Sequence, residues 1–210
     1  NNILNLRDNL RRRLEEKNFI IVDDCDEYKQ IETIYQNKIN SSVYDLTLLP
    51  TLDCNLRCWY CFEKHILGSR LSTIMQDNIL NFVQNILNSK NITALSVTLF
   101  GGEPLLYFKE ELYPLLKKMQ DYAAVVGKSI HFSFITNGVC IDESSIHMFK
   151  ELNAGFQISI DGYREKHNTI KKATGIEYSY DIVMKSIHML CDSYNPYITL
   201  RINYDNQTLL

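Results

Sequence analysis

The sequence predicts an α/β fold built on a parallel sheet, and three observations support this prediction. From about residue 44 onward, short apolar segments of strand character alternate with longer segments of helical periodicity. This alternation is typical of right-handed βαβ units, which produce parallel strands. Polar or glycine-rich motifs follow the strand segments, at the edge where parallel α/β folds place their sites. Hydrophobic residues make up 45% of the 210-residue chain, which is enough to fill a core.

Five strands and four helices are expected in this region. The strands are short apolar or alternating runs, at Tyr44–Leu52, Leu95–Phe100, Ser129–Ile135, Phe156–Ile160 and Tyr197–Asn203. The helices show apolar residues at helical spacing, at Leu71–Leu87, Leu105–Val126, Asp142–Asn153 and Tyr178–Cys191. Asp142 and Glu143 favour a helix start because acidic side chains complement the positive end of the helix dipole.

The first forty residues are more polar and follow a different rhythm. Leucines at helical spacing from residue 6 to residue 14 predict a short amphipathic helix. Phe19–Val22 predicts a short strand, and Glu27–Gln36 predicts a second helix. We therefore expect an N-terminal appendage at residues 1–42 and a core domain at residues 43–210.

The bulk composition excludes some classes of partner. The net charge of −3 gives no electrostatic footprint for nucleic acid. No apolar run approaches the length of a membrane span, so we expect no membrane association. No secretory signal pattern opens the sequence, and we expect a reducing, cytoplasmic location.

A loop after the first predicted strand carries three cysteines at C-x3-C-x2-C spacing, namely Cys54, Cys58 and Cys61. Clustered thiolates select iron–sulfur clusters or zinc. Three thiolates can hold three irons of a cubane and leave the fourth iron open to a substrate or cofactor. A zinc knuckle with His65 as fourth ligand is the alternative, although common structural zinc sites pair their ligands differently. The other three cysteines have no partner at ligand spacing, and these are Cys25, Cys140 and Cys191.

Two motifs after the second and third predicted strands contain small and polar residues that suit a ligand. Gly101 and Gly102 allow a close approach of backbone to ligand and positive φ, and Glu103 adds an acceptor for an ammonium group. Thr136 and Asn137 follow the third strand, where their polar groups can face a cofactor. Ordinary Gly-Gly and Asn-Gly turns are the alternative interpretations.

Two further pairs of polar residues stand at the ends of the fourth and fifth predicted strands. Ser159 and Asp161 are two residues apart, so they point to the same side and can hydrogen-bond ribose hydroxyls. Arg201 and Asn203 also share one strand face, and arginine can bind a carboxylate bidentately. A surface arginine at a strand end is the competing interpretation. We interpret His167 as a solvated residue at a helix start.

The three-cysteine loop, with Tyr60 before its last cysteine, resembles that of the radical S-adenosylmethionine (SAM) superfamily. The order of the motifs at successive strand ends strengthens the resemblance, which extends over roughly residues 44–203. It implies a partial (β/α)6 barrel and a [4Fe-4S] cluster on Cys54, Cys58 and Cys61. In that family the open iron binds the amino and carboxylate groups of SAM. Electron transfer then yields methionine and a 5′-deoxyadenosyl radical, which abstracts hydrogen from the substrate.

The resemblance also implies which residues line the SAM site, and it assigns no catalytic side chain. The glycine-rich motif contacts the SAM amino group in the family, the serine lies near the ribose, and the arginine suits the carboxylate. The implied contacts are Gly101, Gly102, Glu103, Thr136, Asn137, Ser159, Asp161, Arg201 and Asn203.

The aromatic residues around the third cysteine resemble those of the subgroup that matures peptides and proteins. This implies a peptide or protein substrate, an electron donor such as a flavodoxin or ferredoxin, and a C-terminal cysteine-rich SPASM domain. The alternatives are a radical SAM reaction on a small molecule and a non-enzymatic zinc-binding or degenerate module. The family fold has a sixth strand, whereas the sequence stops at Leu210 after five. We therefore expect a truncated barrel that is inactive on a peptide by itself.

Overall fold

The computed structural model describes residues 8–17, 19–20, 25–172 and 175–204. The chain divides into two units, residues 1–41 and residues 42–210. The division falls one residue before the boundary expected from the sequence. Each unit is described by itself.

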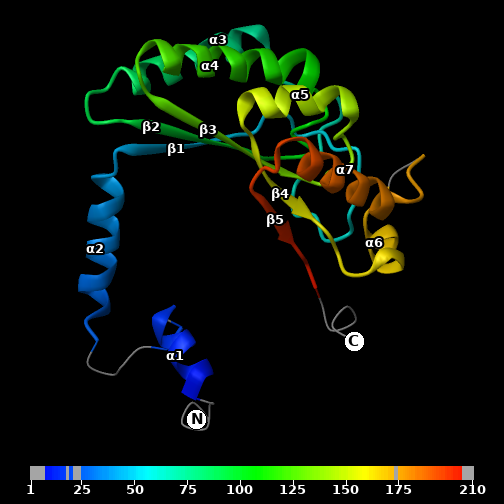
Figure 1. Ribbon diagram of the computed structural model, residues 1–210, viewed down its shortest axis with the longest axis horizontal. Coiled ribbons are helices and arrows are strands. Elements are labelled where there is room, and N and C mark those ends of the chain that lie inside the picture. Colours follow the sequence, from blue (N-terminus) through cyan, green and yellow to red (C-terminus); the bar gives the residue numbers. More distant parts are fainter. Residues whose placement is uncertain (1–7, 18, 21–24, 173–174, 205–210) are drawn as a thin grey trace. The chain divides into compact units, whose positions relative to one another are not determined.

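The larger unit contains a parallel sheet whose strand order follows the order of the chain (Figure 1). The strands are β1 (Val43–Leu48), β2 (Ala94–Leu99), β3 (Ser129–Thr136), β4 (Gly155–Ser159) and β5 (Ile198–Arg201). Every neighbouring pair is parallel, so all five carboxyl ends meet at one edge. The predicted parallel α/β fold is confirmed.

The helices of this unit follow the strands in alternation. They are α3 (Thr73–Leu87), the π-helix η2 (Phe108–Leu112), α4 (Tyr113–Val125), α5 (Glu143–Leu152), α6 (Arg164–Ile170) and α7 (Ser179–Tyr194). Figure 1 shows α3, α4, α5 and α7 on one side of the sheet. Their buried residues form a single core with alternate residues of the strands.

Aromatic rings form the centre of that core. Phe134 and Phe156 are register partners on β3 and β4, and their rings stack at 5.7 Å. Phe149 from α5 contacts both strand rings and stacks on Phe108 at 4.4 Å. Burying four large rings stabilises the layer of helices on the sheet, which in turn fixes the carboxyl edge.

Side-chain caps explain where two of the helices begin. Ser72 accepts a hydrogen bond from the backbone N–H of Met75 at the start of α3. Asp142 caps α5 and forms a capping box with Ser145. The sequence correctly predicted a helix start at Asp142.

Three elements differ from the expectations. The helix predicted for residues 105–126 is a short π-helix followed by α4, because Pro114 at the start of α4 has no N–H to continue the preceding turn. The first strand ends at Leu48 rather than Leu52, shortly before another residue without an N–H, Pro50. The seven-residue helix α6 was not predicted.

The smaller unit contains helices α1 (Asp8–Glu16) and α2 (Glu27–Ile39). The second confirms the helix predicted from residue 27. The strand predicted at Phe19–Val22 is wrong for Phe19 and Ile20, which lie in a bend, and its last two residues lie outside the described ones. Within the described ranges, no helix is long and apolar enough to cross a membrane.

Candidate active site

The three cysteines lie on the long loop between β1 and α3, and buried Asp53 anchors this loop. The carboxylate of Asp53 accepts hydrogen bonds from the backbone N–H groups of Cys54 (2.8 Å) and Gly68 (2.7 Å) and from the hydroxyl of Tyr107 (3.3 Å). Burial opposes ionisation, but these donors outweigh it and lower the pKa of Asp53. A charged Asp53 therefore ties both ends of the loop together.

The cysteines differ in exposure. Cys54 and Cys58 are half-buried, and Cys61 is exposed. A turn joins the last two through a hydrogen bond from the N–H of Cys61 to the carbonyl of Cys58 (3.1 Å). Burial raises the pKa of Cys54 to about 11 and also raises the pKa of Cys58.

Hydrogen-bond donors already point at one sulfur atom. The backbone N–H of Leu56 lies 3.4 Å from Sγ of Cys54, and Nδ2 of Asn137 lies 3.9 Å from it. Donors of this kind favour the thiolate and set the potential of iron–sulfur clusters. Nε2 of His65, the alternative zinc ligand, lies 3.5 Å from Sγ of Cys61. Among the described residues, no three Cys, His, Asp or Glu side chains already form a metal-binding geometry.

Gly102 allows the loop between β2 and η2 to contact the cysteine loop. Its φ is +46°, and a Cβ there would lie 2.1 Å from the carbonyl oxygen of Asp53. Its N–H donates to Oε2 of Glu63 (2.5 Å), and the N–H of Glu103 donates to the same Asp53 carbonyl (2.8 Å). The absence of a Cβ at Gly102 thus lets two loops of the chain approach each other closely, and its predicted contact with a ligand stays a prediction. Glu63 had not been assigned a role from the sequence.

Glu103 joins the second and third predicted motifs. Its carboxylate accepts hydrogen bonds from the hydroxyl of Thr136 (2.7 Å) and from the N–H groups of Asn137 (2.9 Å) and Leu105 (3.0 Å). The side chain is buried, and burial raises the pKa of Glu103 against the effect of these donors. The structure therefore brings together Glu103, Thr136 and Asn137, with both oxygens of the carboxylate already bound within the chain.

The amide of Asn137 continues this network to the cysteines. Its Nδ2 donates to Oδ1 of Asn55 (2.8 Å), and Nδ2 of Asn55 donates to the sulfur of Cys140 (3.4 Å). Cys140, to which the sequence assigned no partner, therefore lies close to the first cysteine of the motif. Burial raises the pKa of Cys140, so its thiol stays protonated.

Asp161 forms a second buried network at the ends of β4 and β5. Its side chain is fully buried, and its Oδ2 accepts a hydrogen bond from the hydroxyl of Tyr60 (2.5 Å) and lies 3.7 Å from Nζ of Lys171. Nδ2 of Asn203 lies 3.3 Å from Oδ1 of Asp161 and 3.1 Å from the Tyr60 hydroxyl. Burial and the neighbouring carboxylate raise the pKa of Tyr60. The predicted site residues Asp161 and Asn203 are thus brought together with two that were missed, Tyr60 and Lys171.

The interpretation of His167 as a solvated residue is wrong. Helix α6 packs this side chain into the interior, where its Nδ1 accepts a hydrogen bond from the N–H of Asp161 (3.2 Å). Burial lowers the pKa of His167 to about 4, and the charge of Lys171 acts in the same direction. The spacing of His167, Ile170 and Lys171, which are all buried, is the helical signal that could have revealed this face.

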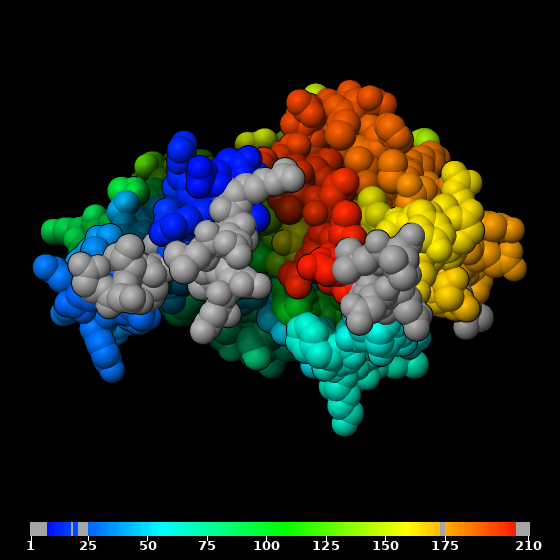
Figure 2. All heavy atoms as spheres, turned by 90° about the horizontal axis from the view of Figure 1, so that it is seen from below, coloured from blue at the N-terminus to red at the C-terminus, as the bar shows by residue number. Residues whose placement is uncertain are grey.

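Ser159 and Arg201 are register partners on β4 and β5. Ser159 is half-buried and Arg201 is exposed. Arg201 does not contribute its side chain to the Asp161 network; its carbonyl accepts a hydrogen bond from the N–H of Ile160 (2.9 Å). Figure 2 shows the surface on which the segment after β1, in cyan, lies beside the end of β5, in red.

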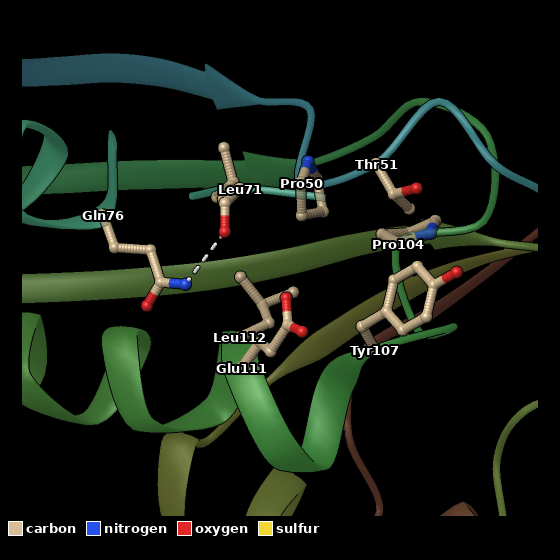
Figure 3. A pocket seen from close by; sticks show the side chains of 8 residues that line it. All are labelled: Pro50, Thr51, Leu71, Gln76, Pro104, Tyr107, Glu111 and Leu112. Atoms are coloured by element: carbon tan, nitrogen blue, oxygen red, sulfur yellow. Dashed lines mark hydrogen bonds between the residues drawn. The ribbon is translucent and has the colours of Figure 1, made fainter. Parts of the chain in front are cut away.

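A small cavity lies between the segment after β1, the start of α3 and η2 (Figure 3). The side chain of Gln76 donates a hydrogen bond to the carbonyl of Leu71 (3.2 Å). The cavity is lined by Pro50, Thr51, Leu71, Gln76, Pro104, Tyr107, Glu111 and Leu112. None of these is a predicted site residue. Through Tyr107, which also binds Asp53, the cavity wall supports the loop.

The fold and the site together define the class of protein, a parallel α/β sheet with a three-cysteine loop at its carboxyl edge. Comparison with known families identifies the family, because the model of the Radical SAM superfamily matches residues 48–206. The chain belongs to the radical SAM superfamily, as the sequence motifs indicated.

Two curated relatives are anaerobic sulfatase-maturating enzymes. The serine-type enzyme of Bacteroides thetaiotaomicron is 30% identical over 145 residues, which are 65% of this chain and 34% of the relative. The cysteine-type enzyme of Clostridium novyi is 31% identical over 144 residues, which are 66% of this chain and 37% of the relative. The chain thus spans about a third of the length of these relatives.

A similar solved structure is native anSMEcpe with bound AdoMet (SAM) and a Cp18Cys peptide. It is 25% identical, with a TM-score of 0.63, over 75% of this chain and 42% of the solved one.

Proposed function

We propose that this chain is the core of a radical SAM enzyme that modifies a peptide or protein. The observation that carries the proposal is the cysteine loop itself, which two buried carboxylate networks hold over the carboxyl edge of the sheet. The Glu103 network reaches Cys54 through Asn137, and the Asp161 network reaches the segment between Cys58 and Cys61 through Tyr60. Residues at the carboxyl edge thus hold the loop from both sides.

Cys54, Cys58 and Cys61 would hold a [4Fe-4S] cluster. The donor set fits this group, because the ligands are soft thiolates and two N–H donors already point at the Cys54 sulfur. When bound, the cluster and SAM supply an electron and a 5′-deoxyadenosyl radical. The protein's own residues orient the cofactor and exclude water.

The SAM site would lie along the carboxyl edge, beside the cysteine loop. Ser159 and Arg201 are only partly buried or exposed, and as register partners they lie side by side. They would bind the ribose and the carboxylate of SAM. The backbone at Gly101 and Gly102 would face its amino group. The buried side chains of the two networks would act behind this surface, by holding its shape.

The peptide or protein substrate is inferred from the relatives, which mature sulfatases by name, and from the peptide bound in the similar solved structure. We place the protein in the cytoplasm, where thiols stay reduced. A flavodoxin or ferredoxin would supply single electrons there.

Anaerobic reconstitution with iron and sulfide tests the proposal. We expect about four irons per chain, visible absorption that bleaches in air, and loss of both when any one of Cys54, Cys58 and Cys61 is replaced by alanine. Cys25→Ala and Cys191→Ala are matched controls and should leave iron content unchanged. Stoichiometric zinc without iron uptake would instead identify a zinc-binding module.

A further inference from the structure

The ion pair between Asp161 and Lys171 is unusual because both partners are buried. The side chain of Asp161 is 0% exposed and that of Lys171 is 4% exposed. Removing two charges from water costs several kcal/mol per ion, and their attraction offsets this only when the geometry and the surrounding hydrogen bonds are good. The other ion pairs of the described residues each have at least one side chain a third or more exposed.

The pair is attached directly to the cysteine loop. The hydroxyl of Tyr60, which stands between Cys58 and Cys61, donates to the Asp161 oxygen that faces Lys171. One residue further along the chain, the carbonyl of Lys172 accepts a hydrogen bond from the N–H of Arg57 (2.8 Å). The pair therefore holds the loop after Cys58, and the backbone next to Lys171 holds it before Cys58.

The two charges are opposite in sign and lie close to the turn that carries the Cys58 sulfur. Tyr60, two residues after Cys58, donates to Oδ2 of Asp161 (2.5 Å), and Nζ of Lys171 lies 3.7 Å from the same oxygen. Side chains as buried as these are screened less by water and salt than surface charges are. A change of charge at either residue should therefore change the electrostatic potential at a group bound to this sulfur.

We propose that Lys171 and Asp161 are positioning residues that hold the Cys58–Cys61 turn through Tyr60 and set the reduction potential of the cluster with opposite signs. Lys171 makes the cluster easier to reduce, and Asp161 makes it harder. The inference rests on the proposed function, because it requires a cluster on these cysteines. It adds to that function the two residues that act on the cluster from behind the cysteine loop.

The test is a redox titration of the reconstituted full-length protein, followed by electron paramagnetic resonance. We expect Lys171→Met to shift the midpoint potential to more negative values and Asp161→Asn to shift it to more positive values. Lys171→Arg keeps the positive charge and should keep the wild-type potential. Lys172→Met is the matched control, because it removes the same charge from the adjacent, exposed side chain and should leave the potential unchanged.

The signs separate this proposal from a merely structural role. If the pair only maintained the fold, both neutral variants would shift the potential in the same direction or not at all, and either result would overturn the proposal. If the Lys171→Met variant binds no cluster, the other two variants test the proposal. A positive shift in Asp161→Asn with an unchanged potential in Lys171→Arg would support it, and any other result would overturn it. A wild-type protein that takes up no iron would contradict the proposed function instead.

Tyr60→Phe separates position from charge. It removes the hydroxyl that joins the pair to the loop and changes no charge at neutral pH. We expect faster loss of iron to a chelator and a smaller shift in potential than either charge variant produces. Wild-type iron retention in Tyr60→Phe would show that the loop is not held in this way.

Discussion

Glu103 and Asp161 are two buried carboxylates at the same edge of one sheet, and their partners differ. Glu103 is bound by two backbone N–H groups and one hydroxyl, all neutral donors. Asp161 is bound by a hydroxyl, an amide and the cation of Lys171. Both networks reach the cysteine loop, one at its first cysteine and one between its last two.

The difference teaches how each carboxylate tolerates burial. Neutral donors only partly offset the loss of hydration, and burial raises the pKa of Glu103. A buried cation compensates the charge of Asp161, but only while that cation is present. The Glu103 network should therefore weaken in small steps as single donors are lost, whereas the Asp161 network should fail when one partner is removed.

The largest expected effect is on the charged network. Lys171→Met leaves the buried carboxylate of Asp161 without its cation, and breaking such a pair typically costs about 3–5 kcal/mol. Urea unfolding of the apo protein measures this loss. The control is Lys185→Met, because Lys185 pairs with Glu143 at an exposed position and should cost less than about 1 kcal/mol. Equal losses in the two variants would contradict the comparison.

A steric change on the Glu103 side should have the next largest effect. Gly102→Ala places a Cβ against the carbonyl of Asp53, which adds about 1–3 kcal/mol of overpacking to about 1–2 kcal/mol for a side chain at positive φ. Gly68→Ala is the matched control, since its φ is +69° and its Cβ would meet nothing within 4 Å. The difference in free energy of unfolding between the two variants isolates the contact. No difference would show that the loops can move apart.

Removing one neutral donor should cost less. Thr136→Val deletes the hydroxyl that donates to Glu103, and an unmade buried hydrogen bond costs about 1–3 kcal/mol. Thr136→Ser keeps the hydroxyl and should recover most of this loss. Denaturant unfolding of both variants measures it. A valine variant as stable as the wild type would mean that this donor is dispensable.

The last effect is a pH dependence from His167, which is graded over a range of pH. Its pKa is lowered to about 4 in the folded protein, below the usual value of about 6.5, so the unfolded chain binds the proton first as the pH falls. The stabilising contribution is complete above about pH 6.5 and is lost toward pH 4, by at most about 1.4 kcal/mol per pH unit.

His167→Gln removes this titration and should flatten the stability curve in that range. The comparison between variant and wild type is needed because Glu103 acts with the opposite sign. The pKa of Glu103 is raised by burial, so its proton uptake stabilises the folded state as the pH falls toward 4.5. Parallel curves for the variant and the wild type would exclude a contribution from His167.

The parts of the fold with a periodic signal were predictable from the sequence. Strand alternation and helical spacing located the sheet and its carboxyl edge, and the edge then located Glu103, Thr136, Asp161 and Asn203. The contact between Tyr60 and Asp161 joins residues 101 positions apart, and no local pattern encodes such a pair. Helix α6 was missed because seven residues are too few for a clear periodicity.

The motif residues have internal partners that their chemistry alone did not predict. The sequence suggested the glycines and carboxylates of the motifs as direct contacts of SAM, and that assignment stays a prediction. In the folded chain the same chemistry is used internally, where Gly102 admits a neighbouring backbone and Glu103 binds N–H groups. Residue type alone does not tell whether a polar group serves a ligand or another part of the chain.

The strand order of the sheet has a consequence for synthesis. Because β1 to β5 lie in chain order, each strand can pair with the one made just before it as the chain leaves the ribosome. The cysteine loop emerges early, but its partners Asp161 and Asn203 emerge much later. At the usual rate of about 5–20 residues per second, Asn203 is made roughly 7–30 s after the first cysteine. A fully held cysteine loop therefore exists only after β5 has been made.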